Sequence, residues 1–253
     1  MITKDQIHQI SKKNKINETT IFREYLQLFF LSELYSRKQS KDIFFKGGTA
    51  LHLIYKAPRF SEDLDFTAGL KEKDFLNFIQ ELFDATSKRE AIEFKERKTL
   101  AGKRFLLTAL PAVLSYKTFV NLDFSFREKV LDPQKSFIET DYPVLFTSYV
   151  YHPSIDELFA EKIRALLTRT KGRDLYDLWY LVTQGARIDK DLVKEKLKYY
   201  HLKDINKDKI IKRVSQFSKK VFVLDVRPLV PVDGRDKLED FFDYIKDYLR
   251  EKF

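Results

Sequence analysis

The chain has 253 residues, of which 43% are hydrophobic and 34% charged, and its net charge is +9 at pH 7. This length allows one large domain or two modest ones, and the absence of cysteine excludes disulfides, thiol nucleophiles and thiolate zinc sites. The four histidines are not at ligand spacing, and no apolar run is long enough for a signal peptide or a membrane span, so we expect a cytoplasmic protein with no membrane partner.

The first predicted elements surround a pair of glycines. Residues 21–35 carry apolar side chains at helical spacing on most faces, which predicts a largely buried helix. The apolar run 43–45 is typical of a short strand, and Thr49–Tyr55 has a helical pattern. Gly47 and Gly48 therefore lie where a strand turns into a helix, a place where backbone amides approach an anion closely. This turn suits a phosphate, to which Thr49 would add a hydroxyl donor.

A pair of aspartates follows the glycines. In Asp63-Leu64-Asp65, a period of two places both carboxylates on one face of a strand and Leu64 on the other. Cations relieve the repulsion between two such charges, and hard oxygen ligands suit Mg²⁺ or Mn²⁺. Either motif alone is more often a plain turn or a solvated strand face. Their order and spacing together favour a site for a nucleotide phosphate and a metal.

A second strand with one polar face is predicted near the middle of the chain. After an amphipathic helix over residues 74–86, the segment Val120–Phe126 alternates strictly between apolar and polar side chains. Asp123 lies at the centre of its polar side. If this strand lies beside the one that carries Asp63 and Asp65, Asp123 becomes a third metal ligand. The alternative is an exposed aspartate on an edge strand.

The C-terminal part of the chain has mainly helical patterns. Pro133, Pro143 and Pro153 are expected to break regular strand pairing and to mark a boundary between domains 1–140 and 141–253. Beyond this boundary, helices are predicted over residues 155–168, 174–182, 189–200 and 238–249.

Most of the excess of positive over negative charge lies in one stretch. Residues 186–220 contain twelve Lys or Arg and five Asp or Glu. With Tyr199 and Tyr200 among the lysines, this stretch suits a polyanion through phosphate contacts and base stacking. The alternative is a solvated helix face, because an apolar helical stripe lies beneath the charges. A smaller basic cluster within residues 95–104 lies nearer the aspartates in the sequence.

A lysine interrupts the apolar stripe of the helix predicted over residues 155–168. Such a lysine usually extends to the surface, but Lys162 could instead point at triphosphate oxygens. Asp174 is placed as an N-cap of the next helix, and Asp177 in its first turn. We expect Asp177 either to hold Lys162 in place or to position the hydroxyl of an acceptor.

Taken together, the motifs resemble the AbiEii/AbiGii toxin family, which includes the MenT toxins, within the DNA polymerase β-like nucleotidyltransferase superfamily. The matching segments occur in family order at residues 46–51, 59–66, 161–166 and 173–178. The resemblance implies an α+β fold, in which a nucleotidyltransferase core with a mixed sheet precedes a helical C-terminal domain and the active site lies in the groove between them.

The same resemblance assigns roles to individual residues. It implies that Gly47, Gly48, Thr49 and Ser61 bind the nucleotide phosphates and that Lys162 contacts the triphosphate. It implies that Asp63 and Asp65 bind Mg²⁺, with Asp123 as the candidate third ligand, and that Asp177 serves catalysis or acceptor positioning.

The implied reaction is attack by an acceptor hydroxyl on the α-phosphorus of a nucleoside triphosphate, with release of pyrophosphate. Family members are toxins of toxin–antitoxin or abortive-infection systems, so a cognate antitoxin is the expected partner. Some are similar to tRNA-modifying enzymes that add nucleotides to the acceptor end, so tRNA is the expected acceptor. The alternatives are a kinase-like phosphotransferase, a small-molecule nucleotidyltransferase, and a non-catalytic protein that binds RNA or an antitoxin.

Overall fold

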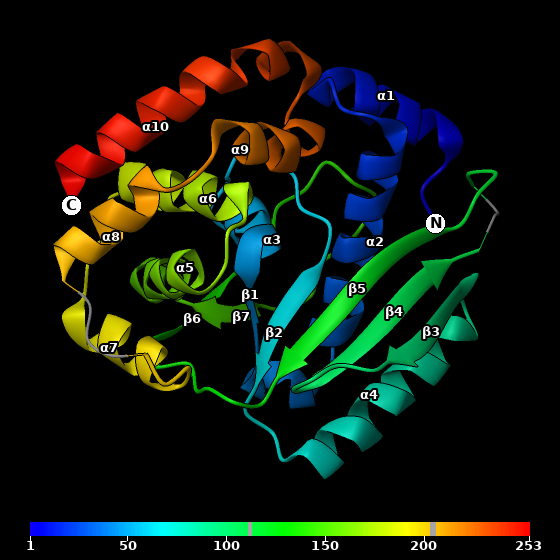
Figure 1. Ribbon diagram of the computed structural model, residues 1–253. Helices are drawn as coiled ribbons and strands as arrows, with labels where there is room; N and C mark the ends of the chain where they lie inside the picture. The colour runs from blue at the N-terminus through cyan, green and yellow to red at the C-terminus, as the bar shows by residue number, and fades with distance from the viewer. Residues whose placement is uncertain (111–112, 203–205) are drawn as a thin grey trace. The chain divides into compact units, whose positions relative to one another are not determined.

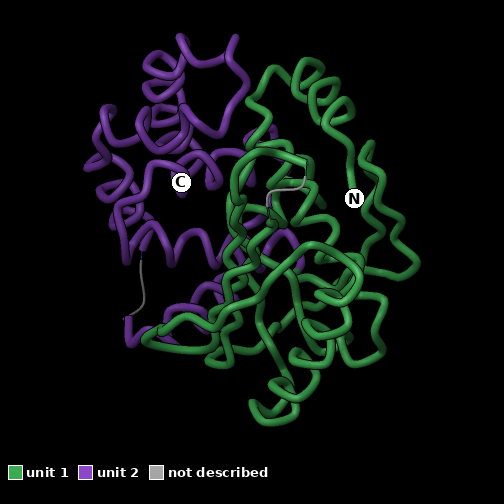
Figure 2. Tube along the Cα trace, turned by 90° about the vertical axis from the view of Figure 1, so that its right-hand side faces the viewer, with its two compact units in different colours: residues 1–56, 60–153 green, residues 57–59, 154–253 purple. Residues whose placement is uncertain are grey.

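The chain folds into two compact units, which Figure 2 distinguishes by colour. The computed structural model describes residues 1–110, 113–202 and 206–253. The first unit comprises residues 1–56 and 60–153, and the second comprises residues 57–59 and 154–253. Three residues just before the aspartate motif thus belong to the second unit, although the chain on both sides of them belongs to the first.

The first unit is built on a five-stranded mixed sheet (Figure 1). Its strands are β1 (Ile43–Lys46), β2 (Leu64–Ala68), β3 (Ile92–Arg97), β4 (Lys103–Ala109) and β5 (Thr118–Ser125). They lie in the order β1-β2-β5-β4-β3, and β2 and β5 are parallel while the other neighbours are antiparallel. The fold is therefore α+β with a mixed sheet, as the sequence predicted.

Among the described residues of this unit, the remaining elements are four helices, a 3₁₀ turn and a two-stranded ribbon. They are α1 (Lys4–Asn14), α2 (Glu18–Tyr35), η1 (Lys38–Asp42), α3 (Gly47–Leu53), α4 (Glu72–Ser87), β6 (Pro133–Ser136) and β7 (Val150–Pro153). Pro133 and Pro153 pair opposite each other in this ribbon, so the expectation that they break strand pairing was wrong. Each lies at the end of its strand, where a missing N–H donor costs the ladder little.

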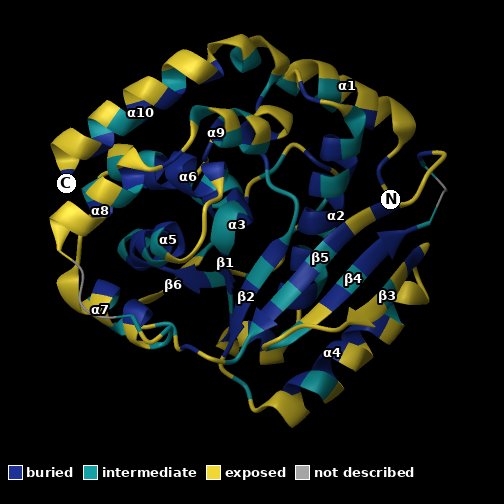
Figure 3. Cartoon of the chain, in the orientation of Figure 1, coloured by how far each residue is buried: buried dark blue, intermediate teal, exposed yellow. Residues whose placement is uncertain are grey.

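One face of the five-stranded sheet is buried by phenylalanines. The rings of Phe66 and Phe124 stack at 4.7 Å between centroids, and those of Phe83 and Phe94 stack at 3.9 Å. Phe83 belongs to α4, and α2 also packs on this side, behind the sheet in the view of Figure 1. The strict alternation in β5 follows from this arrangement, because only every second side chain enters the core while the others lie on an open face (Figure 3).

The second unit is helical. Its helices are α5 (Ile155–Thr168), α6 (Gly172–Thr183), α7 (Lys190–Lys198), α8 (Lys207–Ser215), α9 (Lys219–Val226) and α10 (Leu238–Lys252), with 3₁₀ turns η2 (Arg227–Leu229) and η3 (Val232–Lys237). Helix α5 has the bounds that the sequence predicted, with Ser154 as its N-cap. Helices α8 and α9 were not predicted. In the part of the chain that the structure describes, no helix combines the length and apolar composition needed to cross a membrane.

Helix α6 begins earlier than the sequence predicted. Lys171 is its N-cap residue and Gly172 its first helical residue, so Asp174 lies inside the first turn and Asp177 in the second. The N-cap role of Asp174 was therefore wrong. The start of α6 packs closely on α9, since a Cβ atom at Gly172 would lie 2.5 Å from the Cα of Phe222. Asp225 accepts a hydrogen bond of 2.7 Å from the Gly172 amide and so replaces an N-cap side chain.

Candidate active site

The glycine turn and the aspartate strand are packed directly against each other. Helix α3 begins at Gly47, two residues earlier than predicted, and Gly47 has a φ of +79°. A Cβ atom at this position would lie 2.3 Å from the Oδ2 atom of Asp65. Only glycine therefore meets both requirements, the left-handed backbone and the close approach of the carboxylate. This contact brings the predicted phosphate turn and one predicted metal ligand together within the first unit.

The segment that precedes β2 is held by hydrogen bonds to its backbone. Thr49 is fully buried, and its hydroxyl donates to the carbonyl oxygen of Asp63. Gln27 of α2 donates a bond of 3.1 Å to the carbonyl oxygen of Ser61. In this structure the proton of the Thr49 hydroxyl is therefore used within the protein to position Asp63, and the turn offers backbone amides of α3 as donors to a phosphate.

Two of the three predicted metal ligands lie on adjacent strands of the open face, and Asp63 directly precedes the first of these strands. Strand β5 runs parallel to β2 with Asp65 opposite Asp123, so the adjacency on which the third ligand depended is present. The carboxylates differ in their partners. Asn121 donates a hydrogen bond of 2.8 Å to Oδ1 of Asp63, and Arg104 of β4 donates one of 2.6 Å to Oδ1 of Asp123. Neither Asn121 nor Arg104 was predicted as part of the site.

Two of these carboxylates are enough to hold a divalent cation. Within residues 1–110, 113–202 and 206–253, no group of three or more His, Cys, Asp or Glu side chains has the arrangement of a metal site. Mg²⁺ is commonly held by one or two carboxylates, with water and substrate phosphates completing its coordination. Asp63 and Asp65 supply two such carboxylates, and Asp123, which accepts a hydrogen bond from Arg104, stays the predicted third ligand.

A buried ion pair between a lysine and a glutamate lies next to Asp65, on the side of β1. Lys46, the last residue of β1, lies opposite Asp65 in the sheet, and its ammonium contacts Oε1 of Glu128 at 2.7 Å. Both side chains are buried. Lys46 was noted only as part of the matching segment around the glycines, and Glu128 was missed. Burial of an ion pair is decided by tertiary packing, so no local pattern marks it.

The second predicted constellation is a buried ion network in the helical unit. The ammonium of Lys162 lies 2.6 Å from Oδ2 of Asp177, as the sequence predicted, and it does not extend to the surface. Arg59 donates two hydrogen bonds to the same carboxylate, from Nε at 2.5 Å and from Nη2 at 2.6 Å. Burial alone would raise the pKa of Asp177, but the charges of Arg59 and Lys162 lower it below its usual range.

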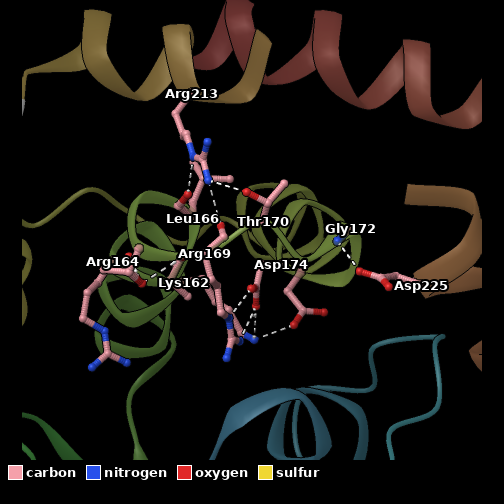
Figure 4. Close-up of polar contacts among 12 residues, drawn as sticks. Lys162, Arg164, Leu166, Arg169, Thr170, Gly172, Asp174, Arg213 and Asp225 are labelled. Atoms are coloured by element: carbon pink, nitrogen blue, oxygen red, sulfur yellow. Dashed lines mark hydrogen bonds and ion pairs between the residues drawn. The ribbon is translucent and has the colours of Figure 1, made fainter. Parts of the chain in front are cut away.

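Asp174, which is fully buried, joins Arg169 to this network (Figure 4). Its Oδ1 atom lies 3.4 Å from the Lys162 ammonium, and Arg169 donates bonds of 2.6 and 2.8 Å to its two oxygens. Burial would raise the pKa of Asp174, yet the charges of Lys162 and Arg169 lower it to about 2. Lys162 is therefore held between two ionised carboxylates, and Arg59 and Arg169 balance their charge.

Part of the basic stretch is used inside the protein. Lys196 is fully buried and contacts Glu157 at 2.6 Å and Glu161 at 3.1 Å. Arg213 donates hydrogen bonds to the carbonyl oxygens of Leu166 and Arg169 (Figure 4). Both predicted uses of the stretch, a nucleic-acid surface and a solvated helix face, are therefore wrong for the buried Lys196, and the side chain of Arg213 is partly used within the protein. These two side chains hold α5, α7 and the turn before α6 together.

A sequence signal existed for some of the missed residues. Arg59 stands four positions before Asp63 within a segment that matches the family, and Asn121 precedes Asp123 by one period of a strand. Arg104 was noted only as part of the basic cluster within residues 95–104, and Arg169 carried no local signal, because their partners lie in other elements of the fold.

Comparison with known proteins agrees with this architecture. Residues 30–247 match the family model of the nucleotidyl transferase AbiEii toxin of type IV toxin–antitoxin systems. A comparison with functionally curated proteins finds no match.

Three solved structures are similar at 18–20% sequence identity, which supports a common fold. MenT4, a nucleotidyltransferase toxin from Mycobacterium tuberculosis H37Rv, has a TM-score of 0.62 and 18% identity over 98% of this chain and 90% of its own. JHP933 from Helicobacter pylori has a TM-score of 0.55 and 20% identity, covering 94% of each chain. A putative nucleotidyltransferase from H. pylori has a TM-score of 0.56 and 19% identity over 94% of this chain and 97% of its own.

Because the family model spans most of the chain, from within α2 to within α10, the protein belongs to the AbiEii nucleotidyl transferase toxin family of type IV toxin–antitoxin systems.

Proposed function

We propose that this protein transfers a nucleotide from a nucleoside triphosphate to a hydroxyl group of an RNA acceptor, with tRNA as the acceptor, and that the reaction depends on Mg²⁺. The observation that carries this proposal is the packing of Asp65 against Gly47, which joins a carboxylate pair to an anion-binding helix start. The type IV toxin–antitoxin family also supports a cognate antitoxin as partner.

In this proposal the first unit binds the phosphates and the metal. The backbone amides at Gly47 and Gly48 bind phosphate oxygens, with Ser61 nearby in the sequence. Asp63 and Asp65 hold Mg²⁺, or Mn²⁺ in its place. When bound, such a cation neutralises charge on the phosphates and lowers the barrier to displacement at the α-phosphorus. Thr49, Gln27 and Asn121 keep the aspartate segment in position.

Lys162 and Asp177 have separate roles in the proposed reaction. Lys162 contributes a positive charge toward the triphosphate, and its position is set by Asp177 and Asp174. Asp177 is fully buried, and both of its oxygens are used by Arg59. We therefore assign Asp177 as a positioning residue, since a carboxylate in this state cannot accept a proton from an acceptor hydroxyl.

The open face of the sheet supports a polyanionic acceptor. Arg104 lies opposite Asp123, and Arg97 lies opposite Arg104, so both share the face of the aspartates. Lys95 shares this face two residues along β3. All three side chains are exposed. Exposed cations beside a nucleotide site attract the phosphates of RNA and would weaken binding as salt increases.

The test is transfer of label from nucleoside triphosphates to total tRNA. Each triphosphate, labelled at the α-phosphate, is incubated with the protein and MgCl₂, and the tRNA is separated on a gel. We expect label in tRNA and release of pyrophosphate, and we expect Asp63→Asn and Asp65→Asn to abolish both. Asp84→Asn, which removes an exposed carboxylate from α4, is the matched control and should transfer at the wild-type rate.

Each alternative gives a different result in the same assay. Transfer from γ-labelled but not α-labelled nucleotide indicates a phosphotransferase. Labelled products that contain no RNA indicate a small-molecule nucleotidyltransferase. Binding of tRNA without turnover, together with no Mg²⁺-dependent thermal protection by any nucleotide, indicates a non-catalytic RNA-binding protein. Full transfer by Asp65→Asn contradicts the proposed site.

A further inference from the structure

A neutral side chain lies among the carboxylates on the open face of the sheet. Strands β2 and β5 run parallel with Asp65 opposite Asp123. Asp63 and Asn121 each stand two residues earlier along the chain, so the same register brings them side by side. The period of two places them on the face of the other two aspartates. Three of the four positions therefore hold carboxylates, and the fourth holds an amide.

Asn121 makes a direct contact with its neighbour Asp63. Its side-chain nitrogen donates a hydrogen bond of 2.8 Å to Oδ1 of Asp63, and both side chains are half-buried. Because an ionised carboxylate only accepts hydrogen bonds, the amide must present its NH₂ group here. The bond uses Oδ1 and fixes the rotation of the carboxylate, so a cation can be bound through Oδ2.

The main chain of Asp63 is held by a separate bond. The hydroxyl of Thr49, in α3, donates to the carbonyl oxygen of Asp63. The backbone is thus held from α3 and the carboxylate from β5. A ligand that is ordered in advance loses less conformational entropy when a cation binds, and it therefore binds more tightly.

The lack of charge on this donor matters as much as its position. A carboxylate in place of the Asn121 amide would lie against the carboxylate of Asp63, and two like charges at this distance repel. A cationic donor would offset the negative charge that attracts a metal ion. An amide orients the carboxylate and leaves its full charge for a divalent cation.

We propose that Asn121 is a positioning residue that sets the metal affinity of the site, because it holds Oδ1 of Asp63 and turns Oδ2 toward the divalent cation. This inference rests on the proposed function, in which Asp63 and Asp65 hold the cation. Hydrogen-bond partners of ligating groups typically contribute about ten- to hundredfold to metal affinity. The role of Asn121 is the same whether or not Asp123 also binds the cation.

The experiment is a titration of the purified protein with Mn²⁺ in the absence of nucleotide, with free ion measured by electron paramagnetic resonance. We expect Asn121→Ala to weaken Mn²⁺ binding about tenfold, because the carboxylate of Asp63 loses its fixed orientation. The matched control is Gln80→Ala on α4, which removes an amide that donates a hydrogen bond of 2.8 Å to the exposed carboxylate of Asp84. This control should keep the wild-type affinity.

Two further variants separate the positioning of Asp63 from a general effect on the strand. In an Asp63→Asn background, Asn121→Ala should change the remaining affinity less than about twofold, because the carboxylate on which the amide acts is gone. Asn121→Gln keeps an amide donor on a longer side chain and should bind Mn²⁺ more tightly than Asn121→Ala. Thermal unfolding without metal checks that each variant keeps the fold.

Several results would overturn the inference. These are wild-type affinity in Asn121→Ala, an equal loss in the wild-type and Asp63→Asn backgrounds, equal affinities of Asn121→Gln and Asn121→Ala, and an equal loss in Gln80→Ala. Absence of Mn²⁺ binding by the wild type would overturn it as well.

The transfer assay is read separately. If the Mn²⁺ pattern holds and no nucleotide is transferred, the proposed reaction fails while the role of Asn121 stands. If the wild type transfers nucleotide and Asn121→Ala binds Mn²⁺ normally, the proposed reaction stands and this inference fails.

Discussion

Two pairs of aspartates in this protein have opposite surroundings. Asp63 and Asp65 lie on the open face of a sheet and are only partly buried, whereas Asp174 and Asp177 are fully buried between helices. Arg59, Lys162 and Arg169 lie at hydrogen-bond distance from the buried carboxylates and balance their charge. In the proposed function, the partly exposed pair binds the cation and the buried pair positions its basic neighbours, so burial separates the two roles of the same side chain.

The largest expected effect is on the buried pair. Asp177→Asn keeps the shape of the side chain but leaves Arg59 and Lys162 buried beside a neutral amide, so we expect the free energy of unfolding to fall by about 3–5 kcal/mol. Urea denaturation measures this change. Asp65→Asn should alter stability far less while abolishing transfer. Equal stability losses in the two variants would remove the distinction between the pairs.

The pH dependence of stability should follow from the buried pair as well. The pKa of Asp174 is about 2 in the folded protein, against about 3.9 in an unfolded chain. Its ionised form thus contributes about 2 kcal/mol of stability above about pH 5, and this contribution is lost as the pH falls toward 2. Urea midpoints measured between pH 7 and pH 2 report how steeply stability falls as the pH is lowered. Asp174→Asn should make this fall less steep, and an unchanged pH dependence would contradict the lowered pKa of Asp174.

The glycine turn offers a matched pair of substitutions. Gly47 and Gly185 have nearly equal φ values, +79° and +80°, but a Cβ atom at Gly185 would meet nothing within 4 Å. Gly185→Ala therefore carries only the backbone cost, about 1–2 kcal/mol. Gly47→Ala also pushes against the carboxylate of Asp65, so we expect a further loss of about 1–2 kcal/mol and weaker Mn²⁺ binding. Equal losses measured by thermal unfolding would show that Asp65 is not constrained by the turn.

The smallest expected effect is at Thr49. Thr49→Val keeps the shape of the side chain and removes the hydroxyl that donates to the Asp63 carbonyl, so stability should fall by about 1 kcal/mol. If the hydroxyl only positions Asp63, the KM for nucleotide should stay near the wild-type value while kcat falls. A rise in KM without a fall in kcat would instead support the predicted contact of Thr49 with a phosphate.

The elements with regular patterns could be predicted from the sequence. The alternation in residues 120–126 predicted a half-buried strand, and α5 has the predicted bounds, because burial on one face imposes a period that local sequence records. The start of α6 could not be predicted in this way. Its first amide is satisfied by Asp225, which lies far along the chain, so the N-cap signal at Asp174 was misleading.

Sequence alone determined the motifs of this site: the glycine turn, the paired carboxylates on one strand face, Asp123 on the polar side of a second strand, and the pairing of Lys162 with Asp177. These depend on short periods and on spacing along the chain. Tertiary structure alone decided which charges meet. Arg104 reaches Asp123 and Arg59 reaches Asp177 because strand order and helix packing bring distant residues within hydrogen-bond distance. The energy of a charge depends on its burial and its partners, and neither is recorded in local sequence.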